Sequence, residues 1–108
     1  MQPAIFHPRA IAVIRLFPRT VRRALGEALL DLQQGANLGM PLSRPMPAVA
    51  PGVCELRVKD AAGIYRVFYL VKSQRGVVVF HASGKKTQKT PAHEIELGRK
   101  RLREVLYE

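Results

Sequence analysis

Basic side chains gather in the second half of the chain, on runs of residues that alternate like β-strands. Arg57 and Lys59 are two residues apart, so on a strand both point to the same face, and Arg66 lies on the next strand-like run. The sequence after the third run adds three lysines, which are Lys85, Lys86 and Lys89. Because a meander places consecutive strands side by side, the sequence predicts one cluster of cations.

Such a cluster suits chemistry at a phosphate. When the 2′-hydroxyl of RNA attacks the adjacent phosphate, the transition state gains negative charge, and cations held in place stabilise it more than the ground state. The strand register selects Arg57, Lys59, Arg66 and Lys86 as the catalytic set. The alternative reading is a solvated face that balances the charge of nearby helices, and the pattern alone does not decide between the two.

Proton transfer needs a group other than arginine, which stays protonated in proteins. Neighbouring cations lower the pKa of a lysine, so Lys59 and Lys86 are candidates for general acid–base catalysis. His81 is a candidate by residue type, although a structural histidine at the end of a strand is the favoured interpretation. His7 and His93 are less promising because both flank expected helices.

No metal or cofactor site is expected. One cysteine and three widely separated histidines give no Cys/His ligand spacing, and GKKTQKT lacks the spacing of a phosphate-binding P-loop. The cysteine, Cys54, shares the apolar face of a strand with Leu56 and Val58 and is interpreted as a small buried hydrophobe rather than a nucleophile.

The composition is that of a globular protein with a strong basic excess. The chain has 108 residues, 47% hydrophobic and 24% charged, with a net charge of +10. This length predicts one domain over residues 1–108. The positive charge predicts a nucleic-acid partner, with an acidic protein as the alternative. We expect no membrane-spanning segment and no secretory signal, hence a cytoplasmic location.

Periodicity predicts an α+β fold. Two helices, over residues 8–17 and 18–34, form a hairpin that ends near Gly35, and a loop rich in proline and glycine crosses over residues 35–52. Three antiparallel strands follow, and Thr90 is expected to cap a final helix in which Pro91 occupies the first turn. The strands are expected over residues 53–59, 64–72 and 76–82.

The second half also resembles a known family. GVCELRVKDAAGIYRVFYLV and VVVFHASGKKTQKTPAHEIELGRKRL resemble the phage-derived, HigB-like branch of the RelE/ParE toxin superfamily, in which G-x-x-E-L-R, Y-R-V-x-Y and H-A-F-x-K-K-T-Q-K-T-P recur in this order. The match covers most of residues 52–102, and its KKTQKTP element is fairly specific.

The resemblance implies a RelE-like fold, with an N-terminal helical hairpin on a twisted antiparallel sheet and a C-terminal helix. It implies the toxin of a type II toxin–antitoxin pair, a metal-independent endoribonuclease that cleaves mRNA on the ribosome. A helix-turn-helix antitoxin would be its partner in a hetero-oligomer. By motif position, Arg66 and Lys86 would stabilise the phosphate and Lys59 would transfer protons, while RNA binding falls to Lys85, Gln88, Lys89 and His81.

The sequence departs from this pattern in two places. Pro91, Ala92 and His93 stand where some relatives carry a tyrosine that orients RNA, and Tyr107 is too distant to replace it. Ser83 replaces the aromatic residue of H-A-F. These departures leave an attenuated nuclease open. A ParE-like toxin that poisons gyrase, disfavoured by the retained basic residues, and a noncatalytic RNA-binding module are the alternative functions.

Overall fold

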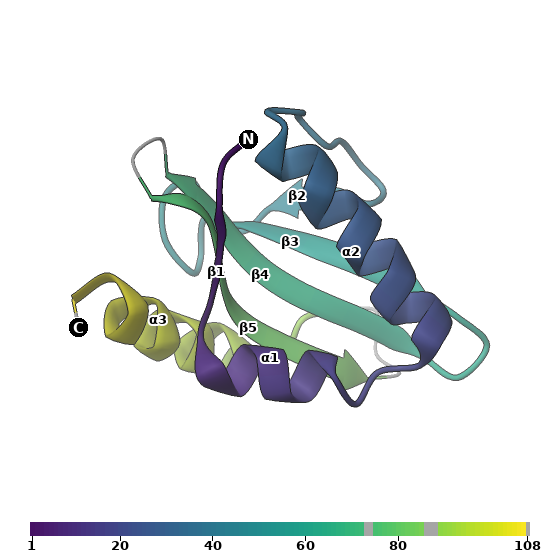
Figure 1. Cartoon of the computed structure of the whole chain (residues 1–108). Helices are drawn as coiled ribbons and strands as arrows, with labels where there is room; N and C mark the ends of the chain where they lie inside the picture. Colours follow the sequence, from purple (N-terminus) through teal and green to yellow (C-terminus); the bar gives the residue numbers. More distant parts are fainter. Residues whose placement is uncertain (73–74, 86–88, 108) are drawn as a thin grey trace.

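The computed structural model describes residues 1–72, 75–85 and 89–107. Its elements follow the order β1, α1, α2, β2, β3, β4, β5, α3 (Figure 1). The helices are α1 (Pro8–Ile14), α2 (Arg19–Gln33) and α3 (Ala92–Tyr107). The strands are β1 (Ala4–Phe6), β2 (Ser43–Pro45), β3 (Cys54–Lys59), β4 (Ile64–Lys72) and β5 (Gly76–Lys85).

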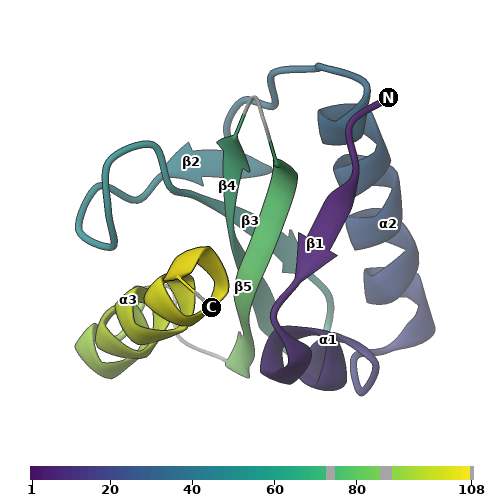
Figure 2. The same cartoon turned by 60° about the vertical axis from the view of Figure 1, so that its left-hand side comes forward.

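The predicted α+β class is confirmed, with a sheet that is more mixed than expected. Within the described residues the sheet has five strands in the order β1-β5-β4-β3-β2. The meander β3-β4-β5 is antiparallel as predicted, and β2 extends it antiparallel to β3. At the other edge β1 pairs in parallel with β5 (Figure 2). The sequence did not predict β1, because three residues are too few to show a period of two.

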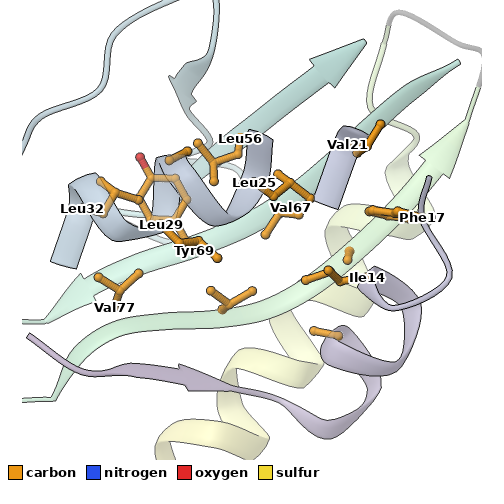
Figure 3. Packing of buried hydrophobic residues seen from close by; sticks show 14 residues of the cluster. Ile14, Phe17, Val21, Leu25, Leu29, Leu32, Leu56, Val67, Tyr69 and Val77 are labelled. Atoms are coloured by element: carbon orange, nitrogen blue, oxygen red, sulfur yellow. The ribbon is translucent and has the colours of Figure 1, made fainter. Parts of the chain in front are cut away.

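The two N-terminal helices begin and end close to their predicted bounds. Pro18 separates them, since its ring suits the start of a helix but not its interior. Gly35 has a positive φ of 92° just after α2, which is the backbone conformation of a helix C-cap. Both helices lie on the same face of the sheet, and their apolar stripes form the first core with it (Figure 3). Its central members include Ile14, Leu25, Leu56, Val67 and Tyr69.

The opposite face of the sheet is covered by α3 and by part of the crossing loop (Figure 2). Met46, Val49 and Val53 of the loop pack with Phe68 and Phe80 of the sheet and with Leu102 of α3. The loop is therefore an ordered crossing, as predicted. It also contains the short strand β2, where Pro45 is tolerated because the strand lies at the sheet edge.

A bulge in β5 decides which side chains face α3. Phe68 pairs with His81 but Tyr69 pairs with Val79, so Phe80 is an extra residue. Phe80 packs in the core on the α3 side, and His81 lies on that side as well, within hydrogen-bonding distance of α3. Without the extra residue, strict alternation would place His81 against α1 and α2. The bulge thereby brings His81 to the face of the sheet that α3 covers.

Candidate functional site

The basic residues predicted on neighbouring strands do lie on one face of the sheet. Arg57 of β3 and Arg66 of β4 are directly opposite each other in the strand register, and Lys59 is two residues beyond Arg57. Like charges directly opposite each other destabilise a sheet. The pair of arginines therefore requires a negative charge nearby.

Glu55 supplies that charge. Its side chain is 0% exposed, and its Oε1 accepts hydrogen bonds from Nε of Arg44 at 3.1 Å and Nε of Arg57 at 3.2 Å. Its Oε2 lies 3.8 Å from Nε of Arg66. A buried carboxylate is costly unless it is paired and hydrogen-bonded, and here three guanidinium groups meet the requirement. Glu55 thus holds the arginines of three adjacent strands in a fixed arrangement.

Thr90 joins the same cluster from the start of the last helical region. Its hydroxyl donates to Oε2 of Glu55 at 2.7 Å and accepts from Nη2 of Arg44 at 3.3 Å. The sequence predicted this hydroxyl as a helix cap, and the structure gives it a different role. It fixes the end of the KKTQKT segment to the sheet beside the arginines.

Access to solvent differs sharply among the three cations. The side chain of Arg66 is 1% exposed, that of Arg57 is 12% exposed, and Lys59 lies at the exposed end of β3. Burial lowers the pKa of Arg66, and the charge of Arg57 lowers it further, while Glu55 opposes both. Solvent therefore reaches Lys59 and, to a small extent, Arg57, whereas Arg66 is buried.

His81 belongs to a second polar cluster between the sheet and α3. Its Nε2 lies 2.5 Å from Oε1 of Glu94, and its Nδ1 lies 3.2 Å from Nη1 of Arg101. Because arginine can only donate, Nδ1 is the acceptor, and the proton assigned to Nε2 is donated to Glu94. Both ring nitrogens are therefore occupied within the protein, and the residue is 2% exposed.

The charges in this second cluster influence one another. Burial lowers the pKa of His81, aided by the charges of Arg101 and His93, and the bond to Glu94 offsets only part of the change. Burial alone would raise the pKa of Glu94, but the hydrogen bond and charge of His81, with smaller contributions that include His93, lower it. A neutral His81 and an ionised Glu94 are thus the favoured pair near neutral pH.

Comparison with family models places this geometry in a known family. Residues 12–103, which are most of the chain, match the family model described as phage-derived Gp49-like protein. The chain belongs to the Gp49-like family. The predicted resemblance to a phage-derived branch of the RelE superfamily is confirmed, whereas the HigB-like assignment within it stays a prediction. Curated protein sequences give no significant match.

Solved structures with the fold of this Gp49-like chain include the isolated RelE toxin of Escherichia coli. The TM-score is 0.57 at 22% identity, and the match covers 92% of this chain and 98% of that one. A chain of the intact E. coli RelBE toxin–antitoxin complex matches with a TM-score of 0.51 at 21% identity, covering 82% and 100%. These likenesses show that the Gp49-like chain has the RelE fold.

Several predicted site residues of this Gp49-like chain belong to the sequence at and after the end of β5. Lys86 and Gln88 lie outside the described residues, and of Lys85 only the backbone, at the end of β5, is described. Lys89 is described and exposed.

No group of three or more His, Cys, Asp or Glu side chains that could hold a metal occurs in the described ranges. No helix in the same ranges combines the length and apolar character that crossing a membrane requires.

Sequence reasoning missed the three residues that organise the Gp49-like cluster. Glu55 and Thr90 both belong to the motifs quoted for the family, G-x-x-E-L-R and K-T-P, which was an available signal. Arg44 gave none, because it lies in the proline-rich loop, and only the pairing of β2 with β3 places it opposite Glu55.

Proposed function

We propose that this chain is the toxin of a type II toxin–antitoxin pair and cleaves mRNA on the ribosome. The observation that carries the proposal is the cluster of Arg44, Arg57 and Arg66 around buried Glu55, with exposed Lys59 further along β3, in a member of the Gp49-like family with the RelE fold. Cations held by a buried carboxylate are prearranged for a charge that grows during a reaction.

The reaction would be attack of a ribose 2′-hydroxyl on the adjacent phosphorus. A bond forms between O2′ and phosphorus, the bond from phosphorus to O5′ breaks, and the products are a 2′,3′-cyclic phosphate and a 5′-hydroxyl. A base takes the proton of the 2′-hydroxyl, and an acid gives one to the leaving O5′. No oxidant or second substrate is required.

The positions and exposures of the site residues suggest a role for each of them in this reaction. Lys59 is exposed on the same strand as Arg57, so it is accessible to RNA and is proposed as the group that transfers protons. Arg57 would contact the phosphate oxygens, and the buried charge of Arg66 would act from behind. Lys86 remains a predicted phosphate ligand on sequence grounds alone. His81, engaged at both nitrogens, would hold α3 rather than move protons.

Cleavage can be tested with translating ribosomes and a defined message, followed by mapping of new 5′ ends. We expect cuts with the wild-type protein and loss of at least about 100-fold in rate for Lys59→Ala, the size typical of a general acid–base group. Lys72→Ala, an exposed lysine at the far end of β4, is the matched control and should cut normally. Absence of cuts with folded wild-type protein would refute the proposal, and RNA binding without cuts would favour a noncatalytic module.

The partner proposed for the toxin is an antitoxin with a helix-turn-helix region, and the location proposed is the cytoplasm. The likeness to a chain of a toxin–antitoxin complex supports an antitoxin partner, and its helix-turn-helix region is proposed from the family resemblance alone. Induced cells should stop growing unless the adjacent reading frame is co-expressed, and their messages should be cut. DNA damage with intact messages would instead favour a gyrase poison.

A further inference from the structure

A hollow of about 470 Å³ opens between α2 and the edge of the sheet. Its walls are apolar and come from Ala24, Val58 and residues 40–42. The cationic lining comes from Arg44, Arg57 and Lys59. Its volume is within the range of about 300–1,000 Å³ that is usual for sites that bind small ligands.

The hollow exists because strand pairing stops early at this edge. β2 pairs with β3 only from Cys54 to Leu56, and the last backbone bond here runs from the amide of Arg57 to the carbonyl of Leu42 at 2.8 Å. Residues 40–42 form a turn beside the end of β3 and not a strand. The remaining residues of β3, Val58 and Lys59, therefore line an open space.

The lining combines two properties that suit one nucleotide. Apolar side chains can cover the face of a nucleobase, and arginine can stack on a base or bind its phosphate. Arg44 and Arg57 are already fixed by Oε1 of Glu55, so little side-chain freedom is lost when a ligand binds. Net positive charge on the lining favours a ligand that carries negative charge.

We propose that this hollow binds one unpaired nucleotide of an RNA strand, next to the phosphate held at the cationic cluster. The proposal rests on the proposed function, because Arg57 and Lys59 belong both to the hollow and to the candidate cleavage site. A strand whose phosphate lies on these two residues has its neighbouring base within reach of the apolar wall. The hollow would then contribute to the choice of base beside the cut.

The test fills the hollow without changing any charge. Ala24→Leu adds a branched side chain to the α2 wall, and Ala12→Leu, at an exposed position of α1, is the matched control. The probe is a short single-stranded 2′-fluoro oligonucleotide, which lacks the attacking hydroxyl, and a second version has one abasic position. Affinities are measured by fluorescence anisotropy without ribosomes.

Wild-type protein and Ala12→Leu should bind the intact oligonucleotide about tenfold more tightly than the abasic one at the sensitive position, which is the usual effect of one stacked base. Ala24→Leu should lose that difference and bind both weakly. Equal binding of the two probes by the wild-type protein would overturn the proposal, and so would an Ala24→Leu protein that is folded and keeps the difference.

These results separate the hollow from the nuclease. If the protein prefers the intact probe but never cuts messages, the proposed nucleotide site is supported and the proposed cleavage is contradicted. If the wild-type protein cuts messages but Ala24→Leu keeps wild-type binding and base preference, the proposed cleavage is supported and the proposed nucleotide site is contradicted.

Discussion

Glu55 shows how much of the site depends on one residue. It lies among Arg44, Arg57 and Arg66 with no exposed surface, so its negative charge is what makes their close approach tolerable. We expect Glu55→Gln to lower the free energy of unfolding by about 3–5 kcal/mol, because the arginines would lose their counter-charge in a buried place. Denaturant unfolding followed by circular dichroism measures the change.

The matched control is Glu27→Gln on α2. Glu27 forms an ion pair with Arg23 at 3.8 Å, but both side chains are largely exposed. Such a pair contributes less than about 1 kcal/mol. Equal effects of the two substitutions would show that Glu55 does not organise the cluster.

His81 gives the stability a predicted dependence on pH. Its pKa is lowered in the folded protein, so below its ordinary value of 6.5 the unfolded chain binds more protons. Stability should therefore fall as the pH drops from 6.5 toward the folded pKa. Glu94, whose pKa is also lowered, adds a second loss below its ordinary value of 4.5.

Unfolding measured between pH 7 and 5 tests the histidine. The slope from one proton is at most about 1.4 kcal/mol per pH unit, and His81→Gln should flatten it. A steep slope that survives His81→Gln would assign the pH dependence to other groups.

At the level of elements, α3 is held so close to the sheet that one glycine is required. A Cβ on Gly98 would lie 2.8 Å from Cδ2 of Phe68 and 2.9 Å from its Cε2. Alanine favours a helix over glycine by about 1 kcal/mol, yet overpacking a core costs about 1–3 kcal/mol. We expect Gly98→Ala to lower stability despite its better helix propensity.

Gly26→Ala on α2 is the matched control for this effect. A Cβ at Gly26 meets no atom within 4 Å, so the substitution should raise stability by up to about 1 kcal/mol. Thermal unfolding of both variants compares them directly. If both substitutions raise the stability, α3 can move away from Phe68 without loss of packing energy, which would contradict the prediction for Gly98.

The elements also show what the sequence could predict. Alternation in β3 placed Arg57 and Lys59 on one face correctly, because a strand of regular register follows a period of two. The same rule fails in β5, where the bulge at Phe80 brings His81 to the α3 side. A bulge adds one residue to one strand only, so it depends on pairing between strands and leaves no local pattern. The contacts of Glu55 with Arg44 and Thr90 could not be predicted either, because both partners come from distant segments of the sequence.

For the whole molecule, the question is whether net charge or its placement governs RNA binding. The chain carries +10, and part of this charge lies away from the site, for example in Lys72, at the opposite end of β4 from the residue that pairs with Lys59. At physiological salt, charges more than about 8 Å apart in solvent act almost independently. Only cations that touch phosphates should therefore release counterions when RNA binds.

Lys59→Ala and Lys72→Ala each remove one positive charge, so they separate the two explanations. Affinity for a short single-stranded oligonucleotide is measured over a series of salt concentrations. Lys59→Ala should reduce the slope of log K against log salt by about 0.7, the value for one phosphate contact on a single strand. Lys72→Ala should leave the slope near that of the wild type. Equal reductions of the slope in the two variants would mean that RNA binds the basic surface as a whole. The cluster around Glu55 would then not be a specific binding site.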